Sequence, residues 1–195
     1  MEAQVSKICQ SAYFHLRNIN SIKHILSPAA IEKLVHAFIT SRLDNGNALL
    51  YGISQSSLRK LQRVQYAAAR VVSGAHRFAD MKEILKKLHW LPVKERISYK
   101  ILLLTFKALN GMAPAYISEL LKLKDYSHNL RSSNSKMLDV PKTRLKTYGD
   151  RAFYKVAPTL WNVLPRDLRC AEKLTTFKAG LKKYLFNVAS KRNDM

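Results

Sequence analysis

The chain has 195 residues, 47% of them hydrophobic, and its 34 Lys and Arg against 13 Asp and Glu give a formal net charge of +21. This hydrophobic content is enough for a buried core and excludes a disordered basic tail. So large an excess of one sign repels itself in a folded protein, and it therefore indicates a polyanionic partner. Nucleic acid is the first candidate and an anionic membrane surface the second.

The cysteine content and the apolar runs bear on the compartment. Two cysteines, Cys9 and Cys170, cannot build a disulfide framework, which favours a reducing intracellular compartment, the nucleus and/or the cytoplasm. The polar N-terminus lacks the apolar segment of a signal peptide. The longest apolar run, Ile101–Leu104 and on past Thr105 to Phe106, is far shorter than the ~20 residues of a membrane span. We therefore expect an intracellular protein without a membrane span.

Apolar residues recur every three or four positions, and Gly and Pro are few (six each), so the sequence predicts a mainly α-helical bundle. Ser27 and Asp80 are expected N-caps, and Ser54 is expected to start a helix that Gly74 ends. Thr175 or Thr176 is expected to cap the last helix. Pro158 predicts a kink or a restart. The expected helices cover about residues 2–20, 28 through 39, 54–74, 81–88, 93–109, 114–121, 151–163 and 175–189.

The helix after Ser54 carries a basic stripe opposite its apolar face. At about 100° per residue, Arg59, Arg63 and Arg70 fall within roughly 40° of one another, with Tyr66 beside them. The stripe is a solvated outer face or a phosphate-contacting one. Both interpretations stay open, because the helix has no acidic residue that would pair with these arginines.

Residues 126–149 lack helical periodicity and are rich in Ser, Asn, Lys and Arg. We expect a basic irregular loop here, or a small β-ribbon that pairs 137–140 with 144–148. Basic loops of this kind contact nucleic acid or are merely solvated.

Sequence patterns of catalytic or metal sites are missing. The six histidines are scattered, no Cys/His group has zinc-ligand spacing, and no glycine-rich phosphate loop is present. Two-metal phosphoryl transfer needs clustered carboxylates, and no two acidic residues are adjacent. The residues therefore predict a non-catalytic binding domain without a metal or a cofactor.

Leu61–Arg70 reads LQRVQYAAAR, which closely resembles a stretch, LQRVQNAAAR, in reverse transcriptases of LINE-type (non-LTR) retrotransposons. The resemblance extends over about residues 10–187, and so many ordered motifs make coincidence a poor explanation. Further motifs follow in the family's order: Leu88–Val93, Arg96–Ile97, Lys100–Gly111, Ala113–Tyr116, Leu130–Ser132, Val140–Arg144, Gly149–Phe153, Ala157–Pro158, Leu160–Asn162, Leu164–Pro165, Phe177–Lys178 and Leu181–Lys182.

This resemblance implies the part of the polyprotein that follows the palm of the RNA-directed DNA polymerase. Residues 1–52 would be a thumb-like helical segment and residues 53–195 the C-terminal helical region. The family's metal-binding aspartates lie upstream and are absent here, so we expect no polymerase activity from this chain alone. Asn45–Gly46 stands where the family usually has Tyr-Cys, which suggests a drifted copy or a tolerated turn.

In the family, this region is expected to help grip template RNA and the primer–template duplex, so the implied partners are RNA and/or DNA and an upstream palm. Trp90 and Trp161 are either base-stacking or, as we favour, core aromatics. The basic residues that we expect to contact phosphates are Arg59, Arg63, Arg70, Arg131, Lys142, Arg144, Lys146 and Arg151.

Two alternatives belong to other classes of protein. The chain could be a decayed or co-opted retroelement remnant that is a protein-interaction scaffold or has no function. It could also be a peripheral membrane protein that uses the basic helix around Lys178–Lys183.

Overall fold

The structure of the chain is a computed structural model that describes residues 1–124, 136–145 and 148–191. Regular structure in these residues is almost entirely helical. Strand-like pairing among them is limited to an antiparallel bridge between Leu123 and Leu138. The predicted mainly α-helical class is therefore confirmed.

The chain divides into two compact units, residues 1–97 and 98–195. The division falls within helix α6 (Val93–Leu109), whose first turn belongs to unit 1 and whose remainder belongs to unit 2. The expected functional boundary between residues 52 and 53 rests on the order of family motifs and stays a prediction.

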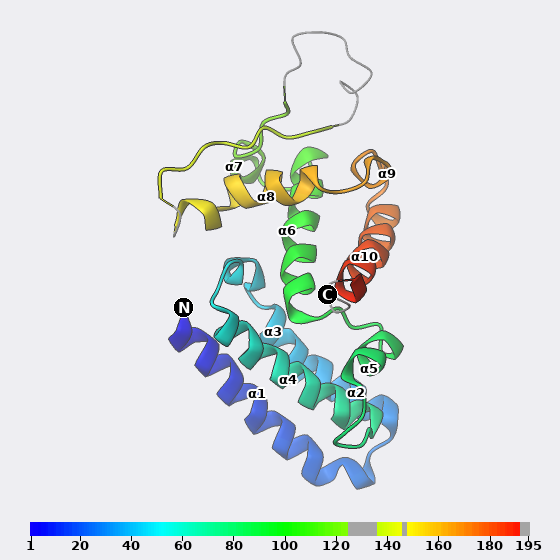
Figure 1. Cartoon of the computed structure of the whole chain (residues 1–195). Coiled ribbons are helices and arrows are strands. Elements are labelled where there is room, and N and C mark those ends of the chain that lie inside the picture. Colours follow the sequence, from blue (N-terminus) through cyan, green and yellow to red (C-terminus); the bar gives the residue numbers. More distant parts are fainter. Residues whose placement is uncertain (125–135, 146–147, 192–195) are drawn as a thin grey trace. The chain divides into compact units, whose positions relative to one another are not determined.

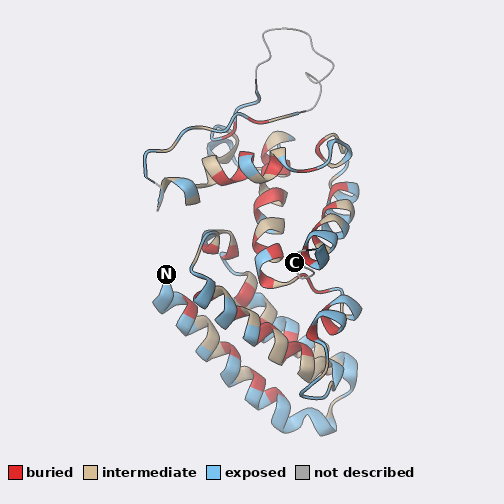
Figure 2. Cartoon of the chain, viewed as in Figure 1, coloured by how far each residue is buried: buried red, intermediate tan, exposed pale blue. Residues whose placement is uncertain are grey.

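Two long helices, α1 (Glu2–Ile22) and α4 (Gln55–Ser73), lie side by side in unit 1 (Figure 1). Each buries one apolar stripe, as amphipathic helices do, and leaves the opposite face exposed (Figure 2). The other elements of unit 1 are η1 (Lys23–Ile25), α2 (Pro28–Val35), η2 (His36–Thr40), α3 (Ser41–Asp44), η3 (Asn47–Leu50) and α5 (Met81–Lys87).

Local signals in the sequence set the ends of these helices. The side chains of the predicted N-caps accept a backbone N–H of the first turn, Ser27 from Ala30 and Asp80 from Lys82. Ser54, which was predicted to start a helix, is the N-cap and accepts from the Ser57 N–H. Gly74 follows α4 with a φ of 64°, a left-handed conformation that glycine adopts without strain. The predicted starts of α2, α4 and α5 and the end of α4 are therefore confirmed.

The helical run from Pro28 to Asp44 contains a π-helical segment, η2, in which the Ser41 N–H donates to the His36 carbonyl five residues back. Its buried residues, Ile31, Val35, Ile39 and Leu43, recur at intervals of four. In a regular α-helix a step of four residues turns the side chain by about 40°, so three steps would carry it out of the core. The wider π turn reduces this drift and keeps all four residues buried.

Unit 2 is organised around three aromatic rings. Phe106 of α6 stacks on Phe177 of α10 (Leu174–Lys191) with ring centroids 4.3 Å apart, and Trp161 of α8 (Phe153–Asn162) lies 5.8 Å from Phe177. All three side chains are almost completely buried. The other elements of this unit are α7 (Ala115–Ser118), η5 (Gly149–Arg151) and α9 (Arg166–Arg169).

Helix α8 holds the segment 136–141 in place. The side-chain amide of Asn162 donates to the Leu138 carbonyl at 2.8 Å and accepts the Leu138 N–H at 2.9 Å. About two turns earlier on α8, Lys155 Nζ donates to the Pro141 carbonyl at 2.8 Å. A side chain thus supplies the backbone pairing that a neighbouring strand would otherwise give.

The structure differs from the sequence predictions in local details of unit 2. The β-ribbon alternative for 126–149 is absent from the described residues, where Leu138 pairs with Leu123 and the rest is irregular. Helix α7 ends at Ser118, because the chain turns before Leu121. The last helix begins at Leu174, so the expected caps Thr175 and Thr176 lie inside its first turn.

Of the two alternatives predicted at Pro158, the restart is wrong, because α8 runs through Pro158 without one, and the kink stays a prediction. Pro158 has no backbone N–H, so it removes a hydrogen bond from the interior of the helix. Burial of Val156, Ala157, Pro158 and Trp161 on one face of α8 offsets this loss.

Candidate nucleic-acid interface

The outer face of α4 presents the basic stripe that the sequence predicts. Arg59 and Arg63 are exposed, as is Lys60 between them. No acidic residue occurs in α4, and none of these three cations has a carboxylate partner among the described residues. The Arg59 Nε makes one long contact, 3.4 Å to the Gln55 carbonyl. The three charged groups are therefore available to a ligand.

Arg70, the last arginine of the stripe, is placed differently. Its Nη2 donates to the Arg77 carbonyl at 3.5 Å, so the guanidinium leans on the loop after α4. Its Nε is buried and has no partner among the described residues. Arg70 is therefore only partly available to a ligand, in contrast to Arg59 and Arg63.

Helix α1 borders the basic stripe with Cys9 and Tyr13. Burial raises the pKa of the Cys9 thiol, and the positive charge of Lys60 opposes that rise. Burial also raises the pKa of Tyr13; Cys9 adds to the rise and Arg63 opposes it. The positive charges of Lys60 and Arg63 therefore lower the pKa values of these two groups of α1, against the effect of burial.

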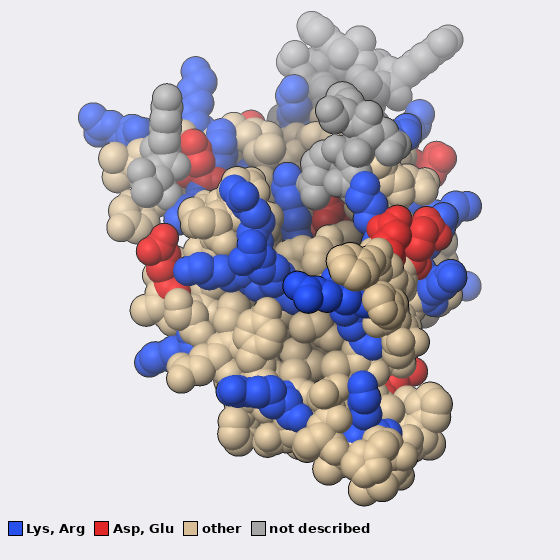
Figure 3. Space-filling view, turned by 60° about the horizontal axis from the view of Figure 1, so that its bottom comes forward, with Lys and Arg blue, Asp and Glu red and all other residues tan. Residues whose placement is uncertain are grey.

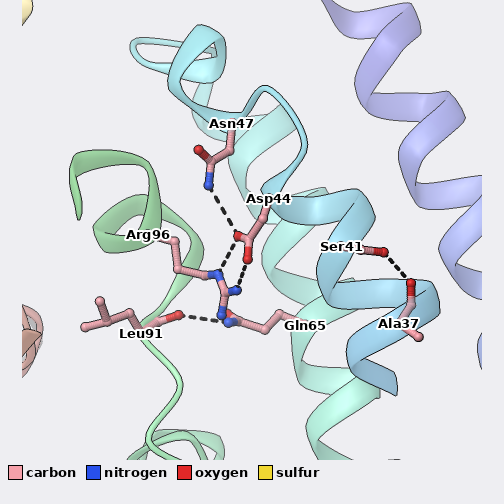
Figure 4. Close-up of polar contacts among 7 residues, drawn as sticks. All are labelled: Ala37, Ser41, Asp44, Asn47, Gln65, Leu91 and Arg96. Atoms are coloured by element: carbon pink, nitrogen blue, oxygen red, sulfur yellow. Dashed lines mark hydrogen bonds and ion pairs between the residues drawn. The ribbon is translucent and has the colours of Figure 1, made fainter. Parts of the chain in front are cut away.

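Two glutamines beneath the stripe fix the position of α4. Gln65 is 1% exposed, and its Nε2 donates to the Leu91 carbonyl at 2.8 Å (Figure 4). Gln62 donates to the Gln65 Oε1 at 2.8 Å and accepts the Val93 N–H at 2.9 Å. The Leu61–Arg70 motif and the Leu88–Val93 motif thus meet through these amides.

Arg96 of unit 1 pairs with a carboxylate of the same unit. Arg96 forms a two-point ion pair with Asp44: Nε lies 2.9 Å from Oδ1, and Nη2 contacts Oδ2 (Figure 4). Asn47 also donates to the Asp44 Oδ1, at 3.3 Å. A bidentate pair of this kind fixes orientation as well as charge. It joins α3 to the first turn of α6.

In unit 2, Lys142 and Arg144 are exposed and Arg151 is half-buried. The bond from Lys155 to the Pro141 carbonyl holds the chain immediately before Lys142. Arg131 and Lys146 lie outside the described residues. Among the described candidates, Arg59, Arg63 and Arg70 share α4 in unit 1, whereas Lys142, Arg144 and Arg151 follow one another in unit 2.

Both tryptophans are core residues, so the base-stacking alternative is wrong for them. Trp90 is 5% exposed and contacts His36 edge-on. Trp161 is 1% exposed, and its Nε1 donates to the Lys136 carbonyl at 2.8 Å.

The sequence analysis did not name Lys60 as a phosphate-contacting residue, although this exposed lysine directly follows Arg59 in α4. The sequence did indicate it, because α4 contains no acidic residue that could pair with either cation. On the face shown in Figure 3, Lys and Arg side chains occur in groups and acidic side chains are fewer.

Comparisons with protein-family models, with curated proteins and with solved structures give no match to this chain. In the described residues, no three His, Cys, Asp or Glu side chains gather in a way that could hold a metal ion. None of the helices in the described part of the chain is both long and apolar enough to span a membrane.

Proposed function

We propose that this chain is a non-catalytic, nucleic-acid-binding C-terminal fragment of a LINE-type retrotransposon reverse transcriptase. In this proposal it grips template RNA or DNA through phosphate contacts while polymerisation occurs in an upstream palm. The observation that carries the proposal is the exposed, acid-free face of α4, with Arg59, Lys60 and Arg63.

Helical geometry supports phosphate contact at this face. Arg59 and Arg63 are one turn apart, so their side chains project from one side of α4, with Cβ atoms about 5–6 Å apart. Guanidinium groups bind phosphate oxygens in two-point geometry, and such contacts position a protein on a strand without reading its bases. Binding without sequence specificity follows from this arrangement.

The proposal is tested by salt titration of the full chain. Fluorescence anisotropy with a labelled oligonucleotide, as RNA, DNA and hybrid, gives Kd between 50 and 200 mM salt. Counterion release predicts that affinity falls steeply, by about a thousandfold if six phosphates are contacted. Binding that is absent, or flat across this range, contradicts the proposal and favours a scaffold remnant.

The membrane alternative uses exposed lysines of α10, among them Lys178, Lys182 and Lys183. Phe177, Leu181 and Leu185 on the same helix are buried within unit 2, so its apolar face is occupied. Co-sedimentation with anionic liposomes that nucleic acid does not compete away would favour this alternative.

A further inference from the structure

An open hollow of about 220 Å³ lies in unit 1, between α1 on one side and α3 with the residue that follows it on the other. It is separate from the basic stripe of α4. Both helices contact each other in this unit, so the hollow is part of its packing. Its lining residues are Gln4, Lys7, Ile8, Ser11, Arg42 and Asn45.

The charged groups of the hollow suit an anion. Arg42 is held from two sides: its Nε donates to the Ser11 Oγ at 2.8 Å and its Nη1 donates to the Phe38 carbonyl at 2.8 Å. These bonds use two of the five guanidinium N–H groups, so donors remain for a ligand. Lys7 adds a second, exposed cation, and the lining has no carboxylate. A pre-positioned guanidinium beside an ammonium matches a phosphate group.

An aromatic cluster adjoins this hollow. The Phe38 ring stacks on His15 with centroids 5.0 Å apart, and Phe14 meets His15 edge-on at 5.3 Å. Phe14 is 54% exposed and Phe38 is 40% exposed, although large aromatics are normally buried. The cluster begins about one helical turn from the hollow, because His15 follows Ser11, and Arg42 follows Phe38, by four residues.

The π-helical segment η2 contributes Phe38 to this cluster. Short π segments inside α-helices are frequent at functional sites. Here the segment directly precedes the turn that carries Arg42, so the same distortion that keeps Ile39 and Leu43 buried sets where Phe38 and Arg42 meet α1.

We infer that this region is a subsite for an unpaired nucleic-acid strand: Arg42 and Lys7 bind one phosphate, and Phe14 and Phe38 stack a neighbouring base. The inference rests on the proposed function and deepens it by naming single strands as the ligand of this subsite. Aromatic stacking is available to a splayed base but not to one that is paired inside a duplex. The full chain should therefore bind a single strand through contacts that a duplex of the same length lacks.

The experiment compares variants of the full chain with single-stranded and duplex oligonucleotides by fluorescence anisotropy at one salt concentration. Phe14→Ala should weaken single-strand binding about fivefold or more and change duplex binding less than twofold. Lys7→Gln combined with Arg42→Gln should weaken single-strand binding more than Lys33→Gln combined with Lys82→Gln does. This second double variant is the matched control, because it removes the same charge from exposed positions of the same unit that lie outside the hollow.

Thermal unfolding of each variant, followed by circular dichroism, identifies any loss of folding; Phe14→Ala removes an exposed ring and keeps the test valid if Arg42→Gln unfolds the chain. The inference is overturned if Phe14→Ala weakens single-strand and duplex binding equally. It is also overturned if the Lys7→Gln, Arg42→Gln variant binds a single strand as well as the Lys33→Gln, Lys82→Gln control does. If the wild-type chain still shows steep salt dependence, the proposed function stands. Wild-type protein that binds neither ligand overturns both.

Discussion

Gln65 and Leu91 are joined by a buried hydrogen bond, from the Gln65 Nε2 to the Leu91 carbonyl at 2.8 Å. Gln65 is 1% exposed, so water does not reach this site. The Gln65 amide therefore supplies the hydrogen bond that the buried Leu91 carbonyl would otherwise receive from water. Gln62 completes the arrangement by bonding both Gln65 and the Val93 N–H. These linked side-chain amides of Gln62 and Gln65, here called the polar relay, therefore hold the start of α6 against α4.

Replacing Gln65 by a side chain of similar volume without donors should destabilise unit 1. Gln65→Leu leaves the buried Leu91 carbonyl without a partner, and we expect a loss of about 1–3 kcal/mol in the free energy of unfolding, measured by urea denaturation. Gln55→Ala, on the exposed first turn of the same helix, is the control and should change stability by less than about 0.5 kcal/mol. Equal effects of the two substitutions would contradict the role of the relay.

Asn162→Ala should release the segment around Leu138. The substitution removes both hydrogen bonds to the Leu138 backbone, so the Leu138 amide should exchange its hydrogen faster in a hydrogen-exchange experiment. We expect a stability loss of about 1–3 kcal/mol. Asn187→Ala, at an exposed position of α10, should leave exchange at Leu138 unchanged. Unaltered exchange in Asn162→Ala would contradict a role for Asn162 in holding the segment.

The Asp44–Arg96 pair should make a modest contribution that salt weakens. Arg96 is 18% exposed at its side chain and Asp44 is 40% exposed, so solvent screens the attraction. In a double-mutant cycle of Asp44→Asn and Arg96→Gln, we expect a coupling free energy of about 1 kcal/mol or less at low salt, and a smaller value at 1 M salt. Additive effects of the two substitutions at low salt would mean that the pair contributes nothing.

The Cys9 thiol should make stability pH-dependent in alkaline solution. Burial raises its pKa above the ordinary value of 9.0, so the folded state keeps the proton to higher pH than the unfolded state does. The folded chain then binds more protons above about pH 9, and the stability that this supplies is full below pH 9 and is lost as pH rises through the folded pKa.

The comparison is the pH dependence of unfolding free energy in wild-type protein and in Cys9→Ala, between pH 8 and pH 10. The wild type should lose more stability with rising pH than the variant does. A steeper loss in Cys9→Ala would show that the thiol is stabilised as the thiolate, with Lys60 outweighing burial.

The helix boundaries in unit 1 could be predicted because their signals are local. Ser27 and Ser54 each accept a backbone N–H in the first turn of the helix that follows. Gly74 adopts the left-handed conformation that ends a helix. The exposure of Arg59 and Arg63 followed in the same way, because burial of one face of α4 leaves the other to solvent.

Interactions between distant residues could not be read from these patterns. Asp44 and Arg96 are 52 residues apart, and Leu138 and Asn162 are 24 apart, so their pairing depends on how helices pack. The partial burial of Arg70 also depends on packing, because the loop after α4 brings the Arg77 carbonyl next to its guanidinium group. The π turn of η2 was also missed. It goes with the spacing of four between buried residues, and no glycine or proline within the segment marks it.

The most direct test of phosphate binding by α4 is the slope of log Kd against log salt for a single-stranded oligonucleotide. Arg59→Gln combined with Arg63→Gln should reduce the magnitude of that slope by about 1.4, since each phosphate contact on a single strand contributes about 0.7. The double variant Lys33→Gln with Lys82→Gln removes the same charge from other exposed positions of unit 1 and should leave the slope nearly unchanged. Equal slopes in the two double variants would contradict a specific role for the α4 arginines.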